Sequence, residues 1–208
     1  MSKSFDEVMQ LTREIGSEAS FSDENAAHMG TWPMNKLLRL NCGSGQRPFG
    51  TTGDGAWINI DIQKRWNPDV VADIRSMPMF EDNSAEYIVL HHVMEHFGLG
   101  ECDDCIRECH RILGPGGSLI VTVPDMDALA KAWLRKEIDD FTYTCAMYGA
   151  YMGSPHDRHA WGFTAKTLAE GLRKATDNWR EVKSFNWREI TGASICKDFW
   201  ILGVEAVK

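Results

Sequence analysis

From residue 37 onwards, short apolar runs alternate with amphipathic segments, and this alternation restricts the folds that the chain can adopt. Residues 99–113 carry apolar side chains at helical spacing and end at "GPGG". Strands that alternate with helices predict a parallel sheet covered by helices on both faces. The runs that we interpret as strands are residues 37–41, 56–62, 69–74, 85–93 and 118–125.

The sequence changes character after residue 125. Residues 126–153 have helical spacing and many aromatic side chains, and residues 164–176 form a helical pattern that begins with a threonine cap. Two further apolar runs, 179–187 and 198–207, lie close enough in sequence to pair as antiparallel strands. We therefore expect the sheet to end in an antiparallel pair.

The chain is long enough for one sizeable domain. It has 208 residues, of which 43% are hydrophobic and 25% charged, as in ordinary globular proteins with a packed core. No internal repeat, low-complexity tract or interdomain linker interrupts it. We predict one domain at residues 37–208, preceded at residues 1–36 by a short helix and a flap.

The charge and hydropathy patterns exclude some partners. Thirty acidic side chains against 22 Lys and Arg leave a net charge of -8, whereas nucleic-acid binding depends on basic side chains that neutralise phosphates. We therefore expect no nucleic-acid partner. No apolar run approaches the ~20 residues that span a bilayer, which predicts no membrane span. With no signal peptide at the N-terminus, we expect a cytoplasmic protein with reduced cysteines.

The first strand pattern ends in a glycine turn, "LLRLNCGSGQRP". Gly43 and Gly45 permit positive φ and let the backbone approach a ligand closely. In doubly wound sheets, ligands bind at the carboxyl ends of the strands, and the first strand-to-helix turn is the usual cradle. Asp61 ends the next strand, where its carboxylate could accept hydrogen bonds from both ribose hydroxyls. The pattern predicts a nucleoside-containing cofactor.

The third position of the glycine pattern argues against a nicotinamide dinucleotide. The dinucleotide fingerprint G-x-G-x-x-G uses its third glycine for close helix packing, which aims a helix N-terminus at the pyrophosphate. Pro48 occupies that position here. A nicotinamide-dependent oxidoreductase is therefore disfavoured.

Four segments in order resemble the class I S-adenosylmethionine-dependent methyltransferases, and more narrowly their type 11 group, which is often linked to sugar or lipid-linked polysaccharide modification. The resemblance covers residues 37 to about 208. It implies an α/β fold: a single-domain, Rossmann-like three-layer sandwich with a seven-stranded, mostly parallel sheet and a reversed last strand. It also implies S-adenosylmethionine as the cofactor. The segments are "LRLNCGSGQRP", "INIDI", "ADIRSMPMFEDNSAEYIVLHHVMEHF" and "ECHRILGPGGSLIVTVPD".

The resemblance also implies which residues hold the cofactor. Asp61 matches the ribose-binding acid, and Asp73 would meet the adenine amino group with Ile74 beside the ring. Asn41 stands where an acidic residue is usual, and its side-chain oxygen could accept from the amino group of the methionine moiety. The predicted cofactor-binding residues are Asn41, Gly43, Gly45, Asp61, Ile62, Asp73, Ile74 and His91.

The segment "HHVMEHF" borders the sulfonium in the resembled family. His91 and His92 are therefore candidates for the active-site wall, although both could instead brace the end of the strand through hydrogen bonds. A hydroxyl acceptor must lose a proton during methyl transfer, and histidine suits that role at neutral pH.

A zinc site must be weighed because His92 and His96 are four residues apart and cysteines follow. However, Cys102, Cys105 and Cys109 fall at i, i+3 and i+7, which is the buried stripe of a helix. Cysteine behaves in such a stripe as a small hydrophobic residue. We expect no metal site.

Candidate residues for acceptor binding and catalysis come from two further places. Asp125 follows the fifth strand, and the loop "SPHDRHAWGF" resembles a D-x-H-x-x-G-F substrate region of the family. The alternative for this loop is an Asp-His turn that only stabilises itself. The predicted catalytic residues are His92, Asp125 and His159.

The sequence thus predicts a methyltransferase that acts on a small molecule, on an oxygen of a sugar, a lipid-linked saccharide or a related metabolite. A different class of function is an S-adenosylmethionine-binding partner or regulatory protein without turnover. The departures from the family pattern at Asn41 and at Arg47, where a further glycine often stands, motivate that alternative.

Overall fold

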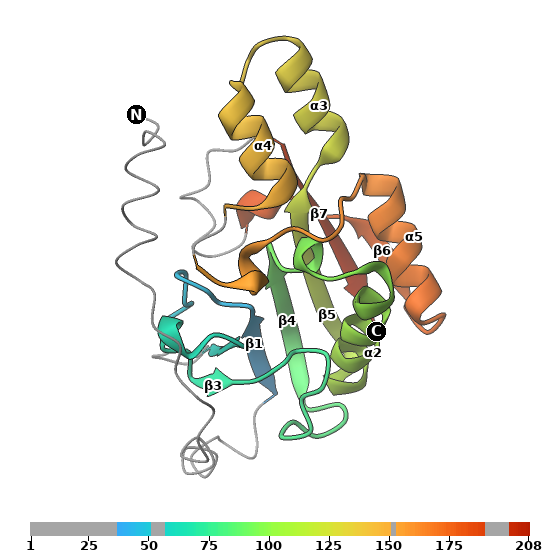
Figure 1. Ribbon diagram of the computed structural model, residues 1–208. Coiled ribbons are helices and arrows are strands. Elements are labelled where there is room, and N and C mark those ends of the chain that lie inside the picture. Colours follow the sequence, from blue (N-terminus) through green and yellow to red (C-terminus); the bar gives the residue numbers. More distant parts are fainter. Residues whose placement is uncertain (1–36, 51–56, 151–152, 190–199) are drawn as a thin grey trace.

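The computed structural model describes residues 37–50, 57–150, 153–189 and 200–208. The helix and flap expected at residues 1–36 lie outside this part of the chain. Seven strands form one sheet in the order β3-β2-β1-β4-β5-β7-β6 (Figure 1). The strands are β1 (Leu38–Cys42), β2 (Ile58–Asp61), β3 (Val70–Val71), β4 (Ala85–His91), β5 (Leu113–Pro124), β6 (Glu181–Ser184) and β7 (Ile201–Val207).

The strand order creates a switch point at the centre of the sheet. The chain runs outward from β1 through β2 to β3 and then returns to β4, which lies on the other side of β1. All of these pairings, and that of β4 with β5, are parallel, whereas β7 is antiparallel to both β5 and β6. This confirms the mostly parallel sheet with a reversed last strand. Ligands of open α/β sheets bind beside such a switch point.

The central strand β4 is buried on both faces, as its continuous apolar run predicts. Successive side chains of a strand point to opposite faces. Ile88 and Leu90 accordingly join the main core cluster, whereas Val89 joins a second cluster with Phe49 and Trp187.

Helices α2 (Leu99–Ile112) and α5 (Ala165–Ala175) pack against each other beside the sheet (Figure 1). The predicted cysteine stripe of α2 is confirmed, since Cys102, Cys105 and Cys109 are all buried in the main core. Thr164 caps α5 by accepting a hydrogen bond from the Thr167 N–H at 3.2 Å. Both helices therefore form where the sequence places them.

The helical region after β5 consists of two helices, α3 (Met126–Leu134) and α4 (Asp140–Tyr148), which stand beyond the carboxyl end of β5 (Figure 1). They are separate because Asp139 caps α4, accepting from the Thr142 N–H at 2.7 Å. Within the described residues, no helix is long and apolar enough to cross a membrane. In the described part of the chain, four short 3₁₀ helices complete the elements: η2 (Lys64–Trp66), η3 (Met94–His96), η4 (Pro155–Asp157) and η5 (Trp187–Glu189).

One boundary differs from the expectation. The "GPGG" segment was expected to be a turn before a strand at residue 118, but β5 begins at Leu113 and includes it. Leu113 pairs with Ala85 and Ser118 pairs with Tyr87, so the segment bulges out of the ladder. Gly116 takes a φ of +81° there, which glycine adopts without strain.

Candidate functional site

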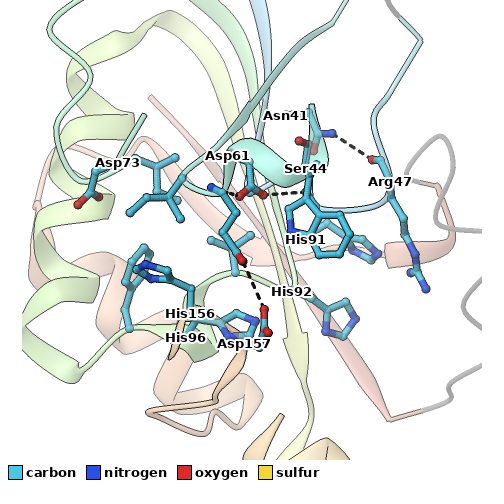
Figure 2. Close-up of a pocket in the computed structure, with 18 of the residues that line it drawn as sticks. Asn41, Ser44, Arg47, Asp61, Asp73, His91, His92, His96, His156 and Asp157 are labelled. Atoms are coloured by element: carbon cyan, nitrogen blue, oxygen red, sulfur yellow. Dashed lines mark hydrogen bonds between the residues drawn. The ribbon is translucent and has the colours of Figure 1, made fainter. Parts of the chain in front are cut away.

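A cavity of ≈ 680 Å³ lies at the carboxyl ends of β1, β2 and β4, beside the switch point. Loops that follow these strands form one side of it. The segment around η4 forms another side and contributes Pro155, His156, Asp157 and His159 to the lining. The volume falls within the range of small-molecule sites. Figure 2 shows Asn41, Ser44, Asp61 and Asp73 on one side, and His92, His96, His156 and Asp157 on the other.

The two glycines of the first turn serve different purposes. Gly43 has a φ of +74°, and a Cβ atom there would clash with Cγ2 of Val93, so the turn packs tightly against the residues after β4. Gly45 also has a positive φ, +48°, but a Cβ atom there would meet nothing within 4 Å. The first glycine is therefore needed for packing, and the second leaves open space at the cavity wall.

Asp61 is held at the end of β2 by backbone amides. Its Oδ2 accepts from the Gly45 N–H at 2.8 Å, and its Oδ1 accepts from the Gln63 N–H at 2.7 Å. The residue is 6% exposed and lines the cavity. Each carboxylate oxygen can accept a further bond. The carboxylate is therefore fixed in place and still able to bind two hydroxyl groups.

The hydrogen bonds of Asn41 account for an amide at the position where the family pattern usually has an acidic residue. Its Nδ2 donates to the side-chain oxygen of Asn59 at 2.9 Å and to the backbone oxygen of Arg47 at 3.3 Å. The same Asn59 oxygen accepts from the Phe49 N–H at 2.7 Å. A carboxylate at position 41 has no proton to donate to these oxygens. The amide therefore shapes the loop after the glycine turn, and Asn41 also lines the cavity.

Asp73 and Ile74 line the cavity after β3. Nε of Arg75 donates to both carboxylate oxygens of Asp73 at 3.0 Å, and the Arg75 backbone N–H donates to one of them at 2.9 Å. The hydrogen bond from Arg75 is the main reason that the pKa of Asp73 lies below its usual value. Ile74 is buried and apolar, so this wall offers a carboxylate beside an apolar side chain.

Two buried polar atoms at the cavity have no hydrogen-bond partner among the described residues: Oγ of Ser44 and Nε2 of His91. Nδ1 of His91 lies 2.6 Å from Oγ1 of Thr122. Burial, followed by the charges of His92 and Arg47, lowers the pKa of His91 to about 3, so the ring is neutral at physiological pH. An unpaired buried polar atom costs about 1–3 kcal/mol. A polar ligand in this cavity would satisfy both atoms, and nothing in the sequence pattern singles out Ser44.

His92 is held by a buried glutamate. His92 takes a backbone φ of +57°, which is unusual for a residue other than glycine. Its Nδ1 lies 3.0 Å from Oε1 of Glu95, which is 1% exposed. Burial alone would raise the pKa of Glu95, but the hydrogen bond with His92 and the rings of His96 and His159 outweigh it, so the pKa lies below its usual value. The sequence pattern does not assign a role to Glu95, although Glu95 stands at i, i+3 from His92.

The loop that contains η4 is fastened to the cofactor side of the cavity. Asp157, 8% exposed, accepts from Nη2 of Arg65 at 2.9 and 3.1 Å and from Nε2 of Gln63 at 3.3 Å. It also accepts from the Ser154 N–H at 3.0 Å. Asp157 thus stabilises the turn, while His156 and His159 line the cavity. Substrate binding by this loop stays a prediction.

The three predicted catalytic residues do not all meet. His92 and His159 line the cavity, whereas Asp125 is not among the lining residues. The Asp125 side chain caps α3 by accepting from the N–H groups of Asp127 and Ala128 at 3.0 and 3.4 Å. All of the predicted cofactor-binding residues, in contrast, line the same cavity: Asn41, Gly43, Gly45, Asp61, Ile62, Asp73, Ile74 and His91.

Comparison with known proteins agrees with this geometry. Residues 40–121, which include the glycine turn, Asp61 and the histidine segment, match the type 11 family model described as "Methyltransferase domain". This match and the relative described next support an S-adenosylmethionine-dependent methyltransferase whose methyltransferase domain includes residues 40–121. A demethylmenaquinone methyltransferase of Mycobacterium sp. (strain JLS) is 26% identical over 200 residues, which cover 87% of this chain and 82% of the relative.

Solved structures share the fold of this methyltransferase at low sequence identity. A SAM-dependent methyltransferase of Methanosarcina mazei superposes with a TM-score of 0.56 at 16% identity, covering 91% of this chain and 99% of that one. One from Archaeoglobus fulgidus gives 0.54 at 12% identity, covering 97% and 94%. The predicted single-domain Rossmann-like fold is thereby confirmed, and S-adenosylmethionine is the cofactor that the family uses.

Proposed function

We propose that the methyltransferase transfers its methyl group to an oxygen of a small hydroxylated molecule, such as a sugar or a related metabolite. The observation that supports this most directly is the pair formed by His92 and Glu95 at the cavity. A hydroxyl acceptor must lose a proton as it is methylated, and a histidine held by a carboxylate is suited to accept that proton.

The side of the cavity formed after β1, β2 and β3 would hold the cofactor. When bound, S-adenosylmethionine would supply a methyl group on a sulfonium sulfur. Asp61 would accept hydrogen bonds from the ribose hydroxyls, beside Ile62, and Gly45 would leave room for the nucleoside. Asp73 and Ile74 would contact the adenine through a carboxylate and an apolar surface. The methionine moiety would lie near Asn41, Gly43, Ser44 and His91, of which Ser44 and His91 supply unpaired buried atoms.

His92 acts as the general base on the acceptor side. Its Nδ1 is held by Glu95, which leaves Nε2 to take the proton of the acceptor hydroxyl. As the proton moves to Nε2, the oxygen forms a bond to the methyl carbon, and the electrons of the carbon–sulfur bond stay on sulfur. S-adenosylhomocysteine and the methylated acceptor are the products. The Glu95 carboxylate stabilises the imidazolium that forms.

Calorimetric titration with S-adenosylmethionine, S-adenosylhomocysteine and NAD tests the cofactor assignment. We expect the two adenosyl ligands to bind and NAD not to bind, and binding of NAD alone would contradict it. Release of S-adenosylhomocysteine is then followed with acceptors of separate classes: free sugars, lipid-linked saccharides and, because of the mycobacterial relative's name, demethylmenaquinone. Turnover with quinone but no hydroxylated acceptor would overturn the proposed acceptor class.

The second candidate is a cofactor-binding protein without turnover. The Asn41 amide donates to Asn59 and to the backbone of Arg47. This part of the first motif departs from the family pattern, which favours the second candidate. It predicts adenosyl-ligand binding with no release of S-adenosylhomocysteine for any acceptor in the panel. Release with even one acceptor, abolished in His92→Ala, would exclude it.

A further inference from the structure

Three ionisable side chains converge next to the proposed base. One ligand atom each from Glu95, His96 and His159 lies within 4.8 Å of the others. Glu95 and His96 belong to η3, which follows β4. His159 is brought to them because the Glu95 backbone oxygen accepts from the N–H groups of Ala160 and Trp161 at 2.7 and 3.1 Å. Two distant segments of the chain are therefore fastened together at this cluster.

Backbone carbonyls fix the tautomers of both histidines. Nδ1 of His96 lies 3.0 Å from the Arg158 oxygen, and Nδ1 of His159 lies 3.0 Å from the Ala146 oxygen. A carbonyl oxygen can only accept, so each neutral ring carries its proton on Nδ1 and keeps a lone pair on Nε2. Histidines that bind metals usually donate their other ring N–H to a carbonyl or carboxylate in this way.

Glu95 supplies an independent indication that a ligand belongs here. Oε1 is occupied by His92, whereas Oε2 is buried and has no hydrogen-bond partner among the described residues. A buried carboxylate oxygen without a partner is destabilising unless a cation or a donor satisfies it. The neutral rings of His96 and His159 offer lone pairs rather than protons at Nε2, so a cation would satisfy the three side chains together.

We propose that Glu95, His96 and His159 form a binding site for a divalent transition-metal ion, with zinc as the ion that fits best. Two imidazole nitrogens and one carboxylate oxygen form a three-ligand set that catalytic zinc sites use, with the fourth position left open. Tetrahedral zinc places its ligand atoms about 3.4 Å apart, so the three side chains must move together by at most about 1.5 Å. This ligand set differs from the His92, His96 and cysteine set considered from the sequence.

The ion has a path to the site and an open side. His96 and His159 both line the cavity, on the wall opposite Asp61 (Figure 2 shows His96). The open position would therefore face the acceptor, and a hydroxyl oxygen bound there becomes more acidic, which eases transfer of its proton to His92. This role rests on the proposed methyl transfer to oxygen, whereas metal binding itself does not.

The experiment titrates Zn²⁺, and separately Co²⁺, into full-length protein that has been treated with a chelator and dialysed. We expect one equivalent of either ion to bind, with visible d–d bands of Co²⁺ and without a sulfur-to-metal charge-transfer band. A strong charge-transfer band would assign the ion to cysteines and overturn the proposal. Fe²⁺ and Mn²⁺ are titrated in parallel, and binding of neither Zn²⁺ nor any of these ions would also overturn it.

Matched variants locate the ion. Glu95→Gln and His159→Gln should each weaken Zn²⁺ binding at least about 100-fold, because loss of even outer partners of metal ligands costs 10–100-fold. His110→Gln changes another half-buried histidine, outside the cluster, and should leave the affinity for Zn²⁺ unchanged. Unchanged affinity in both cluster variants would contradict the site.

A folding control and an activity control separate the two proposals. S-adenosylhomocysteine should still bind to the cluster variants, which shows that they are folded. If zinc binds as expected but chelation leaves turnover unchanged, the acceptor role is wrong while the site stands. If adenosyl ligands bind and zinc does not, the metal site fails while the methyltransferase assignment stands.

Discussion

The two sides of the cavity are built from different kinds of contact. On the cofactor side, backbone N–H groups hold the Asp61 carboxylate, and positive φ angles at Gly43 and Gly45 shape the turn. On the acceptor side, ionisable side chains hold one another, with Glu95 between His92 and the rings of His96 and His159. The contacts to Asp61 come from backbone amides, whereas those on the acceptor side join ionisable side chains to one another. We conclude that changes on the first side affect cofactor binding, and that changes on the second affect turnover and its pH dependence.

The largest expected effect is on turnover. In His92→Ala, kcat should fall by roughly 10²–10⁴-fold, the usual contribution of a general base. The affinity for S-adenosylmethionine should stay close to that of the unchanged protein, because cofactor contacts come from the other side. Single-turnover kinetics with calorimetry separate the two quantities. If His92→Ala lost affinity for S-adenosylmethionine but kept its kcat, the assignment of separate roles to the two sides would be wrong.

The next effect is on cofactor affinity. Asp61→Ala should raise the Kd for S-adenosylhomocysteine at least about 100-fold, because two hydrogen bonds to a charged group contribute roughly 1.5–3 kcal/mol each. Asp61→Asn is the matched control and should lose less, since its amide keeps one accepting oxygen. If Asp61→Ala binds normally, the cofactor is held elsewhere.

The two glycines of the first turn sharpen the comparison within the cofactor side. Gly43→Ala should lower the free energy of unfolding by about 2–4 kcal/mol, because left-handed strain adds to a clash with Val93. Gly45→Ala meets no protein atom and should cost only about 1–2 kcal/mol for the same backbone strain. In Gly45→Ala the added methyl group instead occupies space at the cavity, so ligand affinity should fall.

Chemical denaturation of both glycine variants, with and without S-adenosylhomocysteine, measures these differences. The double variant Gly43→Ala/Val93→Ala serves as the control, since removing the Val93 methyl groups should restore part of the stability. Equal destabilisation by the two single variants would show that the turn does not pack as described.

The smallest expected effect is a pH slope. Because the pKa of His91 is lowered to about 3, the unfolded chain binds more protons than the folded one between that value and the usual 6.5. The free energy of unfolding should therefore fall as the pH drops through this window. In His91→Gln, the difference in bound protons between the unfolded and folded states should be smaller by about one, so the free energy of unfolding should depend less on pH. Denaturation at pH 4 to 7 checks this, and an unchanged slope would place the titrating group elsewhere.

Much of the fold could be predicted because it depends on local patterns. The apolar runs, the cysteine stripe of α2 and the position of Asp61 at the end of a strand are all periodic features of the sequence. The internal bulge of β5 was not predictable, because Gly and Pro in "GPGG" signal a turn equally well outside a strand and inside one.

The acceptor side was harder to predict because its contacts are long-range or depend on backbone geometry. Asp125 ends a strand just as Asp61 does, but it also begins a helix, and its carboxylate caps that helix. Glu95 was missed because its role depends on the positive φ of His92 and on burial below the loop around His159. Neither feature has a sequence signal in a single chain.

The most direct test of the division between the two sides is the affinity for S-adenosylhomocysteine in Asp61→Ala and in Glu95→Gln, measured by calorimetry in one buffer. We predict a loss of at least about 100-fold in the first variant. In the second we predict a change within about twofold, because Glu95 is not among the residues that line the cavity. A large loss in Glu95→Gln, or normal binding in Asp61→Ala, would contradict the account.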